Sequence, residues 1–161
     1  MEWHGRCSAG GMAEFTFREL DAWKQGMALV EEIYRGTRMF PQSEQYGITS
    51  QIRRAALSIP CNVAEGHCRR STRAFMNHVS IALGSLGELD TLVDVCHRLD
   101  YFQADEQQRL SGLAALVGRL LNGLYNSLER KLSAGRENVK RVARVQPRPT
   151  VSRVGVPTSD P

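Results

Sequence analysis

Residues 51–88 read QIRRAALSIPCNVAEGHCRRSTRAFMNHVSIALGSLGE and contain two apolar helical patterns joined by one short turn. Apolar residues recur at spacings of three and four on both sides of the turn, which is the period of helices that each bury one face. Because the connection is short, the two helices are expected to pack antiparallel. The stretch holds no recognisable nucleophile motif, metal-ligand set or phosphate-binding loop, which favours an assembling, charge-presenting helical protein over an enzyme.

The first of these helices is expected over residues 44–65, with Ser43 as its cap and Gly66 as its C-terminal stop. Its apolar face consists of Ile48, Ile52, Ala55, Ala56, Ile59 and Val63. Pro60 lies inside this helix and is expected to kink it, because proline has no N–H to donate to the preceding turn.

The second helix begins at Ser71 and is expected to run for about 29 residues. Its core stripe follows a heptad spacing and consists of Phe75, Val79, Ala82, Leu86, Leu89, Val93 and Cys96. A second stripe beside it consists of His78, Ile81, Ser85, Glu88, Leu92 and Val95. This helix is therefore expected to contact two neighbours.

Two further helices flank the pair. A capping-box pattern at Thr16 opens a helix over residues 17–38, with Leu20, Trp23, Met27, Val30, Tyr34 and Thr37 along one face. A similar pattern at Asp105 opens a helix over residues 105–132, with Leu110, Leu113, Val117, Leu120, Leu124 and Leu128 along one face. The chain is predicted to be all-α, with an up-down-up-down antiparallel four-helix bundle over residues 16–132.

The two ends of the chain differ in composition from this bundle. Residues 1–15 are expected to be a disordered N-terminus, and residues 133–161 a disordered basic tail that is rich in proline and arginine. The tail has 6 basic and 2 acidic residues, and this difference of +4 equals the net charge of the whole 161-residue chain. The sequence has no secretory signal and no apolar run near the ~20 residues that span a bilayer, so a cytoplasmic protein without membrane contact is expected.

Metal and acid–base chemistry were considered at two places in residues 51–88. His67, Cys68 and His78 lie near one another in sequence but have no recognised zinc spacing. Glu65 and Glu88 lack the Glu-x-x-His pattern that bundle metal centres use. No cofactor, metal site or catalytic residue is predicted, and an enzyme is the least favoured class.

Polar residues form a stripe beside the apolar face of the helix over residues 44–65. One interpretation is a solvated helix face. The alternative is that Asn62 and Glu65 meet Ser85 and Glu88 across the antiparallel pair and form a structural polar network that fixes its register.

Five arginines surround the turn, at positions 53, 54, 69, 70 and 73, and Glu65 is the acidic residue among them. Arg53, Arg54, Arg69, Arg70 and Arg73 are the candidate nucleic-acid-binding residues, because guanidinium groups contact phosphates through charge and paired hydrogen bonds. The alternative is a solubilising patch or an inter-subunit salt-bridge patch, since no aromatic residues for base stacking alternate with these cations.

The same residues carry a family resemblance. FRELDAWKQGMALVEEIY, FPQSEQYGITSQIRRAALSIPCNVAEG and RRSTRAFMNHVSIALGSLGEL together resemble the bacterial four-helix-bundle family of 23S rRNA intervening-sequence proteins over residues 15–102. The resemblance implies a bundle that assembles as a homopentamer, without known enzymatic activity. It also implies a relation to accessory proteins of diversity-generating retroelements, which bind a reverse transcriptase and nucleic acid.

The expected function is therefore a non-enzymatic, oligomeric accessory or scaffold protein that binds nucleic acid, with RNA as the expected ligand. The alternative is a protein-interaction module, such as a reverse transcriptase accessory subunit, without direct nucleic-acid binding.

Overall fold

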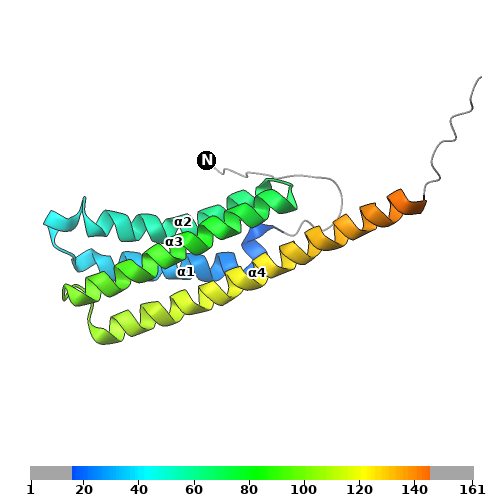
Figure 1. Ribbon diagram of the computed structural model, residues 1–161. Helices are drawn as coiled ribbons and strands as arrows, with labels where there is room; N and C mark the ends of the chain where they lie inside the picture. Colours follow the sequence, from blue (N-terminus) through cyan, green and yellow to red (C-terminus); the bar gives the residue numbers. More distant parts are fainter. Residues whose placement is uncertain (1–15, 146–161) are drawn as a thin grey trace, which may run out of the picture.

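Four α-helices make up most of the computed structural model, which describes residues 16–145 and the side chains of residues 16–137 (Figure 1). They are α1 (Asp21–Gly36), α2 (Ile48–Cys68), α3 (Thr72–Arg98) and α4 (Ala104–Val145). Short 3-10 helices are η1 (Phe17–Glu19), η2 (Thr37–Met39) and η3 (Gln42–Glu44). Residues 16–145 contain no strand.

The helices alternate in direction, and every helix contacts two others. Each packs against its neighbours in chain order, and α1 also packs against α4. The predicted all-α, up-down-up-down antiparallel four-helix bundle is therefore confirmed (Figure 1).

The core is a continuous set of buried apolar side chains along the bundle axis. The fully buried large side chains include Leu29, Ile33, Ile52, Ile59, Val63, Val79, Leu89, Val93, Phe102, Leu110, Val117 and Leu121. The heptad stripe predicted for α3 is buried from Val79 to Cys96, which confirms that reading of the sequence. Burial of this kind contributes about 1.5–3 kcal/mol for each large side chain.

The buried face of α1 differs in part from the predicted one. Val30 and Thr37 are buried as predicted, and Leu20 and Trp23 pack against the core, but Tyr34 is exposed. The core face also contains residues that the prediction did not include: Ala22, Gly26, Leu29 and Ile33. A Cβ placed on Gly26 would lie 3.6 Å from the ring of Pro60.

Both boundaries of α2 also differ from the predictions. Helix α2 begins at Ile48 instead of residue 44, and a Glu44 carboxylate oxygen accepts a hydrogen bond from the Ile48 amide at 3.3 Å in the role expected for Ser43. Helix α2 also continues through Gly66 to Cys68, and Arg70 takes the left-handed conformation beyond its end, with φ of 52°. The cap of α3 is as predicted, because the Ser71 hydroxyl accepts from the Ala74 amide.

Helix α4 is longer than predicted. It continues to Val145, whereas the sequence placed its end at residue 132 and a disordered tail from residue 133. Residues 133–145 contain no proline, and the first proline of the tail is Pro147, so nothing in them breaks a helix that the bundle has already nucleated. Figure 1 shows α4 running well past the end of the other helices. The expected disorder of residues 1–15 and 146–161 lies outside the described residues.

Candidate nucleic-acid interface and the α2–α3 polar network

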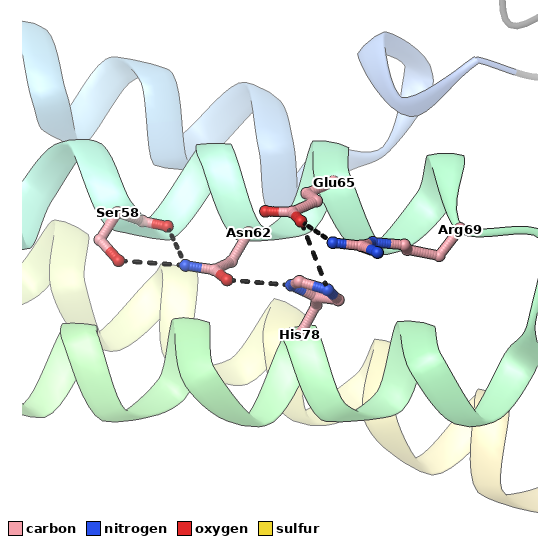
Figure 2. Close-up of polar contacts among 5 residues, drawn as sticks. All are labelled: Ser58, Asn62, Glu65, Arg69 and His78. Atoms are coloured by element: carbon pink, nitrogen blue, oxygen red, sulfur yellow. Dashed lines mark hydrogen bonds and ion pairs between the residues drawn. The ribbon is translucent and has the colours of Figure 1, made fainter.

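A chain of hydrogen bonds crosses the contact between α2 and α3 (Figure 2). His78 Nδ1 lies 3.1 Å from Asn62 Oδ1, and Asn62 Nδ2 donates to the Ser58 carbonyl at 2.8 Å and to the Ser58 hydroxyl at 3.1 Å. The Ser58 and Ser85 hydroxyls lie 2.8 Å apart, and Ser85 donates to the Ile81 carbonyl at 3.1 Å.

These contacts fix the direction of every donor. Ser85 donates to a carbonyl, so the hydroxyl that donates between the two serines is Ser58. The side-chain nitrogen of Asn62 donates to Ser58 on α2, so the side-chain oxygen of Asn62 is the atom that faces His78. Because this oxygen can only accept, His78 carries a proton on Nδ1. The half-buried polar groups thus find hydrogen-bond partners in the register that the helix pair adopts, as expected of a network that fixes register.

Glu65 lies at the exposed side of the network and contacts both Arg69 and His78. Its carboxylate pairs with the Arg69 guanidinium one turn later and lies 3.8 Å from His78 Nε2 (Figure 2). The hydrogen bond from Arg69, with smaller contributions from the charges of His78 and Arg69, lowers the pKa of Glu65 from its ordinary 4.5 despite some desolvation. The carboxylate is therefore held ionised as an acceptor, and it is not set up as a general acid.

The structure places the four predicted network residues differently from the expected pairing. Asn62 and Glu65 both face His78, and Ser85 faces Ser58. Among the described residues, Glu88 makes no hydrogen bond or ion pair; it lines a hollow of about 210 Å³ with Arg54, Leu57, Ser58 and Ser85. The expected residues come from the correct faces, but the register of the pair differs from the one expected.

Arg53 has a structural role at the α1–α2 contact. Its Nε donates to the Thr37 hydroxyl at 2.8 Å and its Nη2 to the Thr37 carbonyl at 3.2 Å, while the guanidinium lies over the Tyr34 ring. Thr37 in turn donates to the Ile33 carbonyl. Arg53 therefore caps the C-terminal end of α1, and we do not include it in the proposed interface.

The remaining candidate arginines divide into two locations. Arg69, Arg70 and Arg73 surround the α2–α3 turn, and Arg54 lies further along α2 beside Glu88. All four are exposed. The five arginines predicted as one cluster thus provide three neighbouring cations at one end of the bundle.

The structure adds a cation that sequence reasoning did not include. A hollow of about 310 Å³ between the α2–α3 turn and α4 is lined by Arg70 and by Lys131, which comes from another helix. Sixty residues separate the two in sequence, and their proximity depends on where α4 crosses the end of the bundle. In the sequence, the basic composition of residues 130–144 was the feature that could have pointed to a cation from α4.

The described part of the chain has neither a metal-binding group nor a membrane-spanning helix. Within it, no group of three or more histidine, cysteine or acidic side chains is arranged to hold a metal ion. No helix within residues 16–145 combines the length and apolar character needed to cross a membrane.

The chain is therefore a small antiparallel four-helix bundle with a polar network between α2 and α3 and a basic end formed by the α2–α3 turn and α4. Residues 18–123 match the family described as 23S rRNA-intervening sequence protein, and the chain belongs to this family. No curated protein matches the chain. The family match ends at residue 123, so Lys131 and the extended part of α4 lie beyond it.

A solved structure with a similar fold comes from Bacteroides thetaiotaomicron VPI-5482. It is described as a protein with unknown function from the S23 ribosomal protein family. The similarity has a TM-score of 0.61 at 18% sequence identity, and it covers 65% of this chain and 95% of the other. At this identity the comparison supports the fold of the bundle.

Proposed function

We propose that this chain is a non-catalytic, cytoplasmic accessory protein that binds nucleic acid, with RNA as its ligand, through the basic end of its bundle. The observation that carries the proposal is the proximity of Arg70 and Lys131 on either side of one hollow, because it joins the cations of the α2–α3 turn to those of α4. The description of the family also refers to 23S rRNA, which supports an RNA-related role.

The charge distribution at this end favours a polyanion. Residues 66–77 contain three arginines and no acidic residue, and α4 contributes Lys131 and Arg136 over the adjoining turns. At this end Glu65 pairs with Arg69, whereas elsewhere in the bundle one acid can pair with two bases, as where Glu32 pairs with both Arg35 and Arg109. A surface with several neighbouring cations gains affinity for phosphates by releasing counterions from the nucleic acid.

Fluorescence anisotropy with a labelled single-stranded RNA tests this proposal. The full chain is titrated into the RNA at several salt concentrations, and a DNA oligonucleotide of the same sequence serves as competitor. Contact with about four phosphates predicts that log K falls with log salt with a slope of about −3. A lack of binding at low salt, or binding that does not depend on salt, would contradict the proposal.

A second candidate function is assembly through an apolar face on α2 and α3. The second α3 stripe predicted from the sequence is incompletely covered, because Ile81 is 52% exposed and Val95 36%. Leu99, just beyond α3, is also 52% exposed, and Leu57 on α2 is 39% exposed. Large apolar side chains aligned on one face are typical of a protein contact. We propose a second copy of the chain as the occupant, within the homopentamer that the family resemblance implies, and a reverse transcriptase is the alternative partner.

Sedimentation equilibrium separates these possibilities. Replacing Ile81 with lysine is expected to lower the measured mass toward that of the 18.0 kDa monomer, because it places a charge in the contact. The matched control is Ser80→Lys, an exposed neighbour on α3 outside the stripe. A wild-type protein that is already monomeric would contradict self-assembly, and a reverse transcriptase pull-down lost in Ile81→Lys would then favour the alternative.

A further inference from the structure

The hollow between the α2–α3 turn and α4 combines an apolar floor with a polar rim. Its lining residues come from three parts of the chain: the segment before α1, the α2–α3 turn with the ends of its two helices, and α4. Its volume of about 310 Å³ is at the lower end of the range for small-molecule sites.

The floor of this hollow is apolar and partly aromatic. Phe75 and His67 line it with their rings perpendicular and their centroids 5.8 Å apart. Leu20, Leu124 and Phe75 are partly buried and Leu128 is buried. An aromatic or apolar group of a ligand would therefore find both van der Waals contact and an aromatic ring in the hollow.

The rim supplies positive charge and hydroxyl groups. Arg70 from the turn and Lys131 from α4 line the hollow, together with the hydroxyl-bearing residues Ser71, Thr72 and Ser127. The Ser71 hydroxyl also caps α3. No acidic residue lines the hollow. These groups suit a ligand that carries an anionic group together with several hydrogen-bonding atoms.

Arg70 has φ of 52°, in the left-handed conformation that commonly ends a helix, and Asp100 takes the same conformation after α3. The turn at Arg70 places this residue among those that line the hollow.

We propose that this hollow binds one unpaired nucleotide, with its phosphate between Arg70 and Lys131 and its base on the floor formed by Phe75, His67 and Leu124. The inference rests on the proposed function in that a single-stranded RNA would supply the nucleotide. A fatty acid would match the floor and one cation but would leave the hydroxyl rim unused. A nucleotide uses the floor through its base, the cations through its phosphate, and the hydroxyls through its ribose.

Nuclear magnetic resonance titration of the full chain with adenosine 5′-monophosphate tests the site directly. The imidazole resonances of His67, which lines the hollow, are expected to shift and saturate with nucleotide. Adenosine and inorganic phosphate, each lacking one half of the ligand, are expected to bind more weakly by at least about tenfold.

Two variants with matched controls locate the binding. Lys131→Gln is expected to weaken adenosine monophosphate binding about tenfold, whereas Arg130→Gln, an exposed cation one residue away, leaves it within about twofold. Ser127→Trp fills the hollow without changing charge and is expected to abolish the His67 shifts, whereas the exposed Asn126→Trp preserves them. Circular dichroism checks that each variant is folded. If Ser127→Trp does not fold, Lys131→Gln still tests the site, because Lys131 is exposed.

The outcomes separate this site from the proposed function. Saturable nucleotide binding that Lys131→Gln weakens would support the site even if the RNA oligonucleotide failed to bind, in which case the proposed function would be wrong. Salt-dependent RNA binding that Lys131→Gln weakens no more than Arg130→Gln does, without nucleotide-induced shifts of His67, would overturn the site and leave the proposed function in place. Equal binding of inorganic phosphate and the nucleotide would also overturn it.

Discussion

Gly66 sets how closely α2 approaches α3 beside the polar network. A Cβ at this position would lie 2.7 Å from His78 Cβ and from the Phe75 ring, and 3.3 Å from the Phe75 Cα. Since the Phe75 backbone cannot move independently of α3, Gly66→Ala is expected to lower the free energy of unfolding by about 1–2 kcal/mol, which is an overpacking cost partly offset by helix propensity. Urea denaturation measures the change.

The matched control for this substitution is Gly112→Ala. Gly112 lies within α4, and a Cβ there would meet nothing within 4 Å. The same change is therefore expected to raise the free energy of unfolding by up to about 1 kcal/mol through helix propensity. Equal effects at the two glycines would show that close packing at Gly66 has been overestimated.

Glu65 provides a prediction about charge at the residue scale. The Arg69 hydrogen bond is the largest cause of the lowered pKa of Glu65, so Arg69→Gln is expected to bring that pKa back toward 4.5. Because the pKa of Glu65 is depressed in the folded state, its contribution to stability is present above the unfolded value and is lost as the pH falls through the folded value. The stability difference between wild type and Arg69→Gln should therefore shrink on acidification.

Carboxyl resonances of Glu65, followed by nuclear magnetic resonance from neutral to acidic pH, measure this pKa in both proteins. Glu129, an exposed acid on α4 for which the same titration is run, serves as the internal reference. If the pKa of Glu65 is the same with glutamine at position 69, the assigned ion pair is absent in solution.

At the scale of elements, α4 consists of a bundle segment and an extension. Leu121 and Leu128 are buried in the core, whereas residues 133–137 are all exposed. A chain that stops after residue 132 is expected to retain its free energy of unfolding within about 0.5 kcal/mol, because residues 133–137 contribute no buried side chain. The same truncation should weaken RNA binding, since it removes the 6 basic residues beyond residue 132.

A chain that stops after residue 120 is the control for this truncation. It loses both Leu121 and Leu128 and is expected to be destabilised by at least about 4 kcal/mol, as judged from single core truncations. Urea midpoints and RNA anisotropy are measured on both truncated chains. A large loss of stability on stopping after residue 132 would mean that the extension packs on the bundle in solution.

The helices show how much of the fold could be predicted from sequence. In α3 large apolar residues recur at heptad spacing, so both its existence and its buried stripe followed from the pattern. In α1 the buried face includes Ala22 and Gly26, and Gly26 lies against Ile59 and Pro60 of α2, a contact that hydrophobicity along one helix does not indicate. The end of α4 was placed too early because a charged composition was read as disorder, although charged residues are good helix formers.

The candidate site was predictable only in part, for a similar reason. The polar residues of the α2–α3 seam were identified from their spacing, but their pairing requires the relative axial position of two helices, which spacing along one helix does not contain. His78 and Lys131 complete the network and the basic end from other elements. The structural role of Arg53 depends in the same way on Thr37 of the preceding segment.

At the scale of the whole molecule, charge and apolar surface lie on different parts of the bundle. The cations of the α2–α3 turn and α4 occupy one end, while Ile81, Val95 and Leu99 lie along the side of α3. A ring of copies joined along the sides would leave the basic ends available together. Several weak phosphate contacts would then act jointly on one RNA, and the affinity would exceed that of a single bundle.

The central claim is that the basic end of the bundle is the nucleic-acid interface. The most direct measurement compares RNA affinity and its salt dependence in two variants of equal net charge. Arg70, Arg73 and Lys131 are changed to glutamine in one, and the exposed Arg38, Arg98 and Arg119 are changed in the other. We expect the first set to make the slope of log K against log salt shallower by about 2, while the second leaves it nearly unchanged. Equal slopes in the two variants would show that the basic end is not the nucleic-acid interface.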